Sequence, residues 1–155
     1  MDTKRKLGVM KEIEAANKRH VEEWKREQAG RKITGVLVDV TTRTAAKVTV
    51  EKDLDSYYKI LNCRCIDIVR RGISGKRFYI ICDDEALLTS SPRVSAVGID
   101  GEVMLAGNLF VVQTDGGDDL QSLTEAEIRH VLLNAKRLVS LVHRDIRCVL
   151  TNCTY

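Results

Sequence analysis

Three acidic residues in succession, Asp83, Asp84 and Glu85, directly follow the apolar stretch "YIIC". Two carboxylates held close together can act as an acid–base pair or bind Mg²⁺ through their oxygens. Because successive side chains of an extended chain point to opposite faces, Asp83 and Glu85 can converge while Asp84 points away. The alternative is a solvated turn, since Asp readily accepts hydrogen bonds from nearby backbone amides. We favour the turn and keep Asp83 and Glu85 as the weaker alternative, a pair of metal ligands.

The densest group of basic residues beyond the N-terminal segment flanks the sequence "GISGK" at 72–76. Arginine and lysine bind phosphate through charge-assisted hydrogen bonds, and Tyr57, Tyr58 or Tyr79 can stack on a base. The alternative is the solvated end of a hairpin, because "GISGK" lacks the spacing of a phosphate-binding loop. The residues of this weak candidate ligand site are Arg70, Arg71, Lys76, Arg77, Tyr79 and Arg93.

The cysteines give little support for metal binding or catalysis. Cys63 and Cys65 are closer together than the paired cysteines of structural zinc sites, and the spacing of Cys148 and Cys153 is at the outer limit. A catalytic cysteine needs a base, and nothing in the sequence links a histidine to a cysteine. We therefore predict no catalytic residue, no cofactor and no metal.

Residues 4–29 are predicted to form one long amphipathic helix that ends near Gly30. Residues 1–32 contain ten Lys and Arg against six Asp and Glu, and the rest of the chain is nearly neutral. Because the charges of this helix are mixed, nucleic-acid binding is disfavoured, and docking onto a partner protein or a second copy is favoured. The predicted partner face consists of Leu7, Met10, Ile13, Val21 and Trp24.

The remaining sequence predicts a domain of strands and helices. Asp53 is placed to cap a short helix, and Thr124 with Glu127 forms a capping box at the start of a long helix predicted at 123–143. The tail after 144 is either a final strand or an extension of that helix. Strands are predicted at 33–40, 44–50, 65–71, 77–84, 94–100 and 108–114, with 33–40 and 44–50 forming a hairpin.

This order predicts an α+β fold, in which a mainly antiparallel sheet packs against a long C-terminal helix and an extra N-terminal amphipathic helix is added. The length of 155 residues suits one domain, predicted at 33–155, with residues 1–32 as a helical extension. Nothing approaches an apolar membrane span, and Met1–Gly8 lacks the apolar stretch of a signal peptide. We therefore expect a cytoplasmic protein that does not bind membranes.

Residues 33–139 resemble the bacterial and phage family known as domain of unknown function 3846. The resemblance lies in "ITGVLVDVTTRTAAKVTVEKDLDSYYKIL", "CIDIVRR", "ICDDEALL", "SSPR", "MLAGNLFVV" and "LQSLTEAEI". This sequence departs from the family pattern at Ala86, where the family has a turn glycine, and at Pro92, where the family has an asparagine before the arginine.

The resemblance implies an accessory protein of a phage or mobile genetic element, acting in a bacterial host cell, with no known activity. We expect a non-catalytic protein that binds a host factor, one used in defence for example. Two alternatives stay open: a binder or sponge for a phosphorylated nucleotide, and a nucleic-acid-binding protein.

Overall fold

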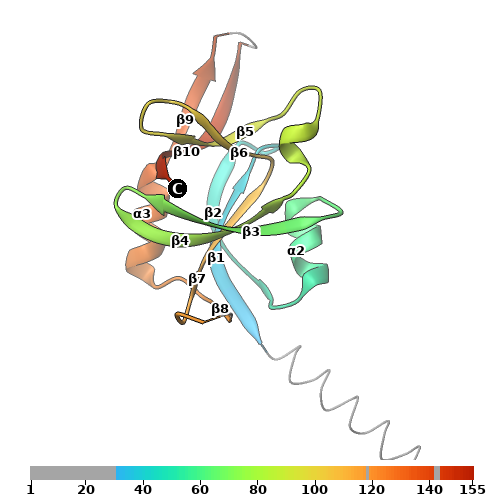
Figure 1. The fold of residues 1–155 in the computed structure, drawn as a ribbon, viewed down its shortest axis with the longest axis vertical. Helices are drawn as coiled ribbons and strands as arrows, with labels where there is room; N and C mark the ends of the chain where they lie inside the picture. The colour runs from blue at the N-terminus through green and yellow to red at the C-terminus, as the bar shows by residue number, and fades with distance from the viewer. Residues whose placement is uncertain (1–30, 118, 142–143) are drawn as a thin grey trace, which may run out of the picture.

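A curved β-sheet makes up most of the protein in the computed structural model, which describes residues 31–117, 119–141 and 144–155 (Figure 1). The predicted N-terminal helix and its partner face lie outside the described residues. The strands are β1 (Lys32–Asp39), β2 (Thr44–Glu51), β3 (Ile66–Ile73), β4 (Lys76–Asp83), β5 (Val94–Gly98), β6 (Val103–Ala106), β7 (Leu109–Thr114), β8 (Leu120–Gln121), β9 (Ala135–Ser140) and β10 (Asp145–Thr154). The helices are α2 (Leu54–Leu61), the short 3-10 helix η1 (Ala86–Leu88) and α3 (Glu125–Asn134).

The strands follow the order β2-β1-β7-β4-β3-β10-β5-β6, with β8 paired to β7 and β9 paired to β10. β5 and β10 run parallel, and the other described pairs are antiparallel. The predicted hairpin at 33–50 is correct, since β1 pairs with β2 from Lys32–Glu51 to Asp39–Thr44. The strand predicted at 77–84 lies in the middle of the sheet, as expected from its apolar sequence.

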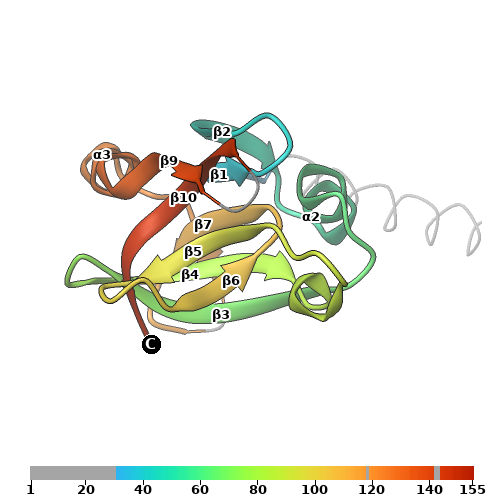
Figure 2. The same cartoon turned by 90° about the horizontal axis from the view of Figure 1, so that it is seen from above.

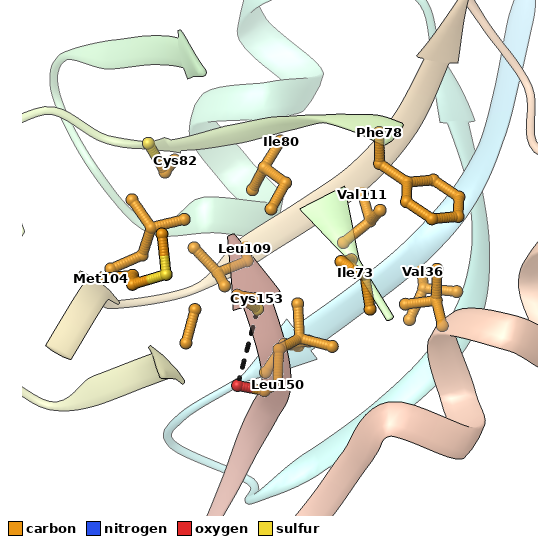
Figure 3. Close-up of a cluster of buried hydrophobic side chains, with 14 of the residues drawn as sticks. Val36, Ile73, Phe78, Ile80, Cys82, Met104, Leu109, Val111, Leu150 and Cys153 are labelled. Carbon is orange, nitrogen blue, oxygen red and sulfur yellow. Dashed lines mark hydrogen bonds between the residues drawn. The ribbon is translucent and has the colours of Figure 1, made fainter. Parts of the chain in front are cut away.

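The sheet curves around the larger of two apolar clusters, which Figure 3 shows. Phe78 and Ile80 of β4 contribute to it together with Leu150 of β10, and all three are fully buried. Strands from both ends of the strand order meet in this cluster, because Val36 of β1 and Met104 of β6 both belong to it. Burial of these side chains against one another is the main force that holds the sheet in its curved form.

Helix α2 covers the opposite face of the sheet, as Figure 2 shows from above. It begins at the predicted cap, where Oδ1 of Asp53 accepts a hydrogen bond from the amide of Ser56 at 2.8 Å. Tyr57 and Leu61 point inward from the helix and pack with Phe110 of β7 in the second apolar cluster. The ring centroids of Tyr57 and Phe110 are 6.3 Å apart.

The predicted long C-terminal helix is wrong beyond Asn134. The capping box of Thr124 and Glu127 is present, but the chain leaves the helix at Ala135 and continues as β9, antiparallel to β10. Oγ1 of Thr151 donates to the main-chain oxygen of Asn134 at 2.9 Å, and Nδ2 of Asn152 donates to Oδ1 of Asn134 at 3.0 Å. Because these hydrogen bonds from β10 bind the last residue of the helix, the helix ends there, and the following residues pair with β10 as a strand.

The predicted α+β class is therefore corrected to a mainly β fold with short helices, at least for the part of the chain that the structure describes. The open question about the tail is also answered, because Asp145–Thr154 is strand β10. The β9–β10 ribbon projects beyond the rest of the sheet in Figure 1.

Candidate anion-binding site

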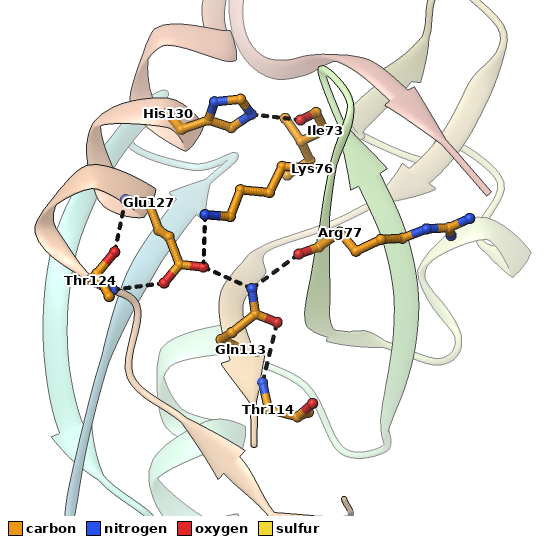
Figure 4. Close-up of polar contacts among 8 residues, drawn as sticks. All are labelled: Ile73, Lys76, Arg77, Gln113, Thr114, Thr124, Glu127 and His130. Carbon is orange, nitrogen blue, oxygen red and sulfur yellow. Dashed lines mark hydrogen bonds and ion pairs between the residues drawn. The ribbon is translucent and has the colours of Figure 1, made fainter. Parts of the chain in front are cut away.

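The predicted basic turn between β3 and β4 makes contacts within the protein. Nζ of Lys76 lies 3.5 Å from Oε2 of Glu127 on α3, a carboxylate that is nearly buried (Figure 4). The same Oε2 accepts a hydrogen bond from Nε2 of Gln113 at 2.8 Å, and Nε2 also donates to the main-chain oxygen of Arg77 at 3.0 Å. Nε2 of His130 lies 2.7 Å from the main-chain oxygen of Ile73. These contacts fasten the turn to helix α3.

The arginines of this turn are divided between different surroundings. Nη1 of Arg77 donates to the main-chain oxygen of Tyr155 at 2.8 Å, and the guanidinium of Arg71 lies 5.0 Å from the centre of the Tyr155 ring. Arg70 is exposed and lies opposite Tyr79 in the β3–β4 ladder, where Tyr79 packs against the second apolar cluster. The predicted residues thus lie near one another, but Arg71, Lys76 and Arg77 already have partners.

The acidic stretch forms a turn at the end of β4. Oδ1 of Asp83 accepts a hydrogen bond from the amide of Glu85 at 2.9 Å, and the amide of Asp84 donates to the main-chain oxygen of Cys65 at 3.1 Å. Oε2 of Glu85 lies 3.8 Å from Nη2 of Arg64. Within the described ranges, no three His, Cys, Asp or Glu side chains gather as metal ligands would. Ala86, one departure from the family pattern, is buried beside Gly107.

The cysteines of the described chain are all free thiols. Cys82, Cys148 and Cys153 are buried, and burial raises the pKa of Cys82 and of Cys153 to about 11. Burial also raises the pKa of Cys148, although Arg137 opposes the shift. These thiols are therefore protonated at neutral pH and are poor nucleophiles.

Arg93 lies in a different place, in a small cavity together with two arginines that sequence reasoning missed. Arg43 follows β1, Arg93 precedes β5 and Arg147 belongs to β10. The cavity holds about 50 Å³. The full lining consists of Val40, Arg43, Arg93, Val94, Asp145, Ile146, Arg147 and Cys148.

Local hydrogen bonds hold the segments that carry these arginines. Oδ1 of Asp39 accepts from the amides of Thr41 and Thr42 at 2.9 and 3.1 Å, which closes the turn before Arg43. Arg43 itself has a positive φ of 61°. The main-chain oxygen of Arg93 accepts from the amide of Gly107 at 2.8 Å. The Asp39 side chain thus fixes the turn, and a main-chain hydrogen bond fixes the start of β5.

A second contact fixes the wall of the cavity on the β1 side. The amide of Val40 donates to Oδ1 of Asn108 at 2.9 Å, and Nδ2 of Asn108 donates to the main-chain oxygen of Ile60 at 3.1 Å. Asn108 is buried, so this bridge between β1 and the end of α2 is shielded from water. It holds Val40 in place in the wall of the cavity.

The charges around the cavity favour an anion. Three arginines line it against one acidic residue, Asp145, whose Oδ1 lies 3.3 Å from Nε of Arg147. Arg147 and Asp145 are both partly buried, with side chains 23% and 34% exposed. Val40, Val94 and Ile146 supply apolar walls, which strengthen the attraction between an arginine and an anion by keeping water away.

Size and composition limit what this site can do. A volume of about 50 Å³ suits one small group such as a phosphate or carboxylate, and the rest of a larger ligand must stay outside. Among the described lining residues, the candidate nucleophile is Cys148, whose thiol is protonated because burial raises its pKa. The arrangement is therefore equipped for binding through charge-assisted hydrogen bonds.

None of the described helices has the length and apolar composition that crossing a bilayer requires. Comparison with curated proteins and with solved structures gave no match for this chain. The sequence profile of a domain of unknown function, DUF3846, matches residues 33–136. That match spans β1 through α3 and includes Arg43 and Arg93, while Arg147 lies beyond it. The suspected resemblance is therefore confirmed, and the chain belongs to the DUF3846 family.

Proposed function

We propose that this protein is a non-catalytic binding protein whose ligand carries a phosphate group, a phosphorylated nucleotide in particular. The observation that carries the proposal is the convergence of Arg43, Arg93 and Arg147 on one small cavity from three separate segments. Arginine presents several N–H donors in a planar fork that matches phosphate oxygens. Three such forks around a cavity for one small group favour a terminal phosphate.

The proposal leaves the nucleoside outside the cavity. Ile146 lines the cavity and is 47% exposed, so it offers an apolar contact to a base or sugar outside. Specificity for phosphate over carboxylate follows from the number of donors, because a phosphate monoester offers three oxygens and close to two negative charges at neutral pH. The ligand is held without turnover, since the described lining residues include no activated nucleophile.

The wider role that fits this chemistry is a sponge. The family resemblance implies an accessory protein of a phage or mobile element, and capture of a signalling nucleotide is one way to counteract a host defence. A sponge needs tight binding and no catalysis, which is what a cavity lined by arginine and apolar side chains supports.

The test begins with native mass spectrometry of the freshly purified protein, which reveals a ligand that is carried through purification. Thermal melting is then measured with inorganic phosphate, nucleoside monophosphates and cyclic dinucleotides, because a ligand that binds the folded state raises its Tm. Arg93→Gln and Arg147→Gln are each expected to weaken binding about tenfold or more, roughly 1.4 kcal/mol.

The matched control is Arg70→Gln, which removes an exposed arginine of β3 that does not line the cavity. It is expected to bind as the unmodified protein does. Equal loss of binding in all three variants would instead mean that net charge, rather than this cavity, attracts the ligand. If no phosphate compound raises the Tm, the proposed function is wrong.

A further inference from the structure

Strand β9 has an edge that no other strand of the described part of the chain covers. It pairs with β10 along its whole length, and no other described strand pairs with it. An exposed strand edge offers unpaired N–H and C=O groups to which an extended peptide can add as a further strand. Such an edge is either protected from binding or used for it.

The side chains of β9 form a simple pattern. Lys136 and Arg137 come first, and Leu138 and Val139 follow, and all four are exposed. Leu138 is 45% exposed and Val139 is 65% exposed, which is high for apolar residues in the middle of a ribbon. Since neighbouring residues of a strand point to opposite faces, each face of the ribbon has one basic residue followed by one apolar residue.

From this pattern we infer that the β9 edge binds an extended segment of a partner protein, added antiparallel to β9, with two adjacent apolar residues followed by two adjacent acidic residues. The apolar pair lies opposite Val139 and Leu138, and the acidic pair lies opposite Arg137 and Lys136. Cross-strand pairs of opposite charge and of apolar side chains are the contacts that stabilise a sheet. The main-chain hydrogen bonds supply affinity, and the order of the side chains supplies specificity.

Charge complementarity selects this occupant over a second copy of the chain. In the described part of the ribbon, Lys136, Arg137, Arg144 and Arg147 stand against Asp145. Two copies of so basic a ribbon repel each other, and lysine on an edge strand is a common protection against self-pairing. The apolar pair selects against a nucleic acid, since Leu138 and Val139 have no favourable contact with a phosphate backbone.

The probe is a fluorescent peptide of about nine residues with Val-Val-Asp-Asp at its centre, measured by anisotropy against the full chain. Two controls have the same composition: one with the four residues alternated, and one with N-methyl groups on alternate backbone amides. We expect the patterned peptide to bind at least tenfold more tightly than either control. The double variant Lys136→Glu, Arg137→Glu should lose that binding and instead bind a Val-Val-Lys-Lys peptide.

Three outcomes would overturn the inference. The first is equal affinity for the patterned and alternated peptides, or no binding of either. The second is tighter binding of single-stranded DNA that the double variant abolishes, which would assign the edge to nucleic acid. The third is a dimer in sedimentation that the double variant dissociates, which would assign the edge to a second copy. Circular dichroism of the variant checks that the fold is retained, as expected for exposed positions.

Discussion

Gln113 of β7 donates a hydrogen bond of 2.8 Å to Glu127 of α3, and so ties the helix to the middle of the sheet (Figure 4). Glu127 is at the same time the acidic member of the capping box, since its Oε1 accepts from the amide of Thr124 at 3.0 Å. One buried carboxylate therefore both starts the helix and anchors it. This junction holds α3 at the position from which the chain enters the β9–β10 ribbon.

Replacement of this carboxylate tests the junction. Glu127→Gln keeps the size of the side chain but loses the charge that faces Lys76 and places an amide against the amide of Gln113. We expect the free energy of unfolding to fall by about 1–2 kcal/mol, measured by urea denaturation. Glu125→Gln is the matched control, because Glu125 is exposed and its ion pair with Lys47 lies on the surface. A control that destabilises as much as Glu127→Gln would contradict the account.

The junction also predicts a pH dependence. Burial acts to raise the pKa of Glu127, but hydrogen bonds from Gln113 and Thr124 and the charge of Lys76 outweigh it and hold the pKa below its ordinary value of 4.5. A carboxyl whose pKa is lowered by folding stabilises the protein above its unfolded pKa, and this stability is lost as the pH falls through the folded pKa. The difference in Tm between the unmodified protein and Glu127→Gln should therefore be constant from pH 7 to about 5.5 and shrink below about 4.5. A difference that grows on acidification would show that the sign is wrong.

The end of α3 gives a third prediction. Asn134 is nearly buried, its side chain donates to the main-chain oxygen of His130 at 2.8 Å, and it accepts from Asn152. Asn134→Ala leaves these buried groups without partners, so we expect a loss of about 1–3 kcal/mol in unfolding free energy. Leu133→Ala is the control, since Leu133 is 71% exposed and its loss should change stability by less than about 0.5 kcal/mol. If both variants behave alike, β10 does not end the helix.

Gly35 in β1 gives a prediction about packing between strands. A Cβ atom at this position would collide with the main-chain oxygen of Val111 and lie 2.9 Å from the Phe110 ring, both in β7. We expect Gly35→Ala to lower the unfolding free energy by about 1–3 kcal/mol, because neither the backbone nor the buried ring can easily move away. Gly117→Ala, in an exposed loop, should leave stability nearly unchanged. Thermal melting of both variants measures the difference. Equal stability of the two variants would mean that β1 and β7 are less closely packed.

Local signals in the sequence predicted much of the fold correctly. Asp53 and the pair Thr124 and Glu127 mark the starts of α2 and α3, because a cap depends on residues within one turn. The end of α3 was missed, because Leu138 and Val139 continue the helical spacing of apolar residues past Asn134. What ends the helix is contact with Thr151 and Asn152, which local periodicity does not reveal.

The candidate site was only partly predictable for the same reason. Arg93 was selected from the sequence, but Arg43 and Arg147 lie far from it along the chain and belong to no motif. They meet at one cavity because β5 pairs in parallel with β10, next to the β1–β2 turn. The sequence favours the basic turn at Arg70–Arg77 because its charges are adjacent in the chain, but the structure gives most of them partners within the fold.

Phosphate binding by the three cavity arginines can be tested at each residue by following the side-chain Nε–H signals of the arginines by NMR while inorganic phosphate is added to the full chain. We expect the signals of Arg43, Arg93 and Arg147 to shift together with a single Kd, while the signal of Arg70 stays in place. Signals that do not move, or that move first for Arg70, Arg71 or Arg77, would contradict it and place the anion elsewhere or nowhere on this protein.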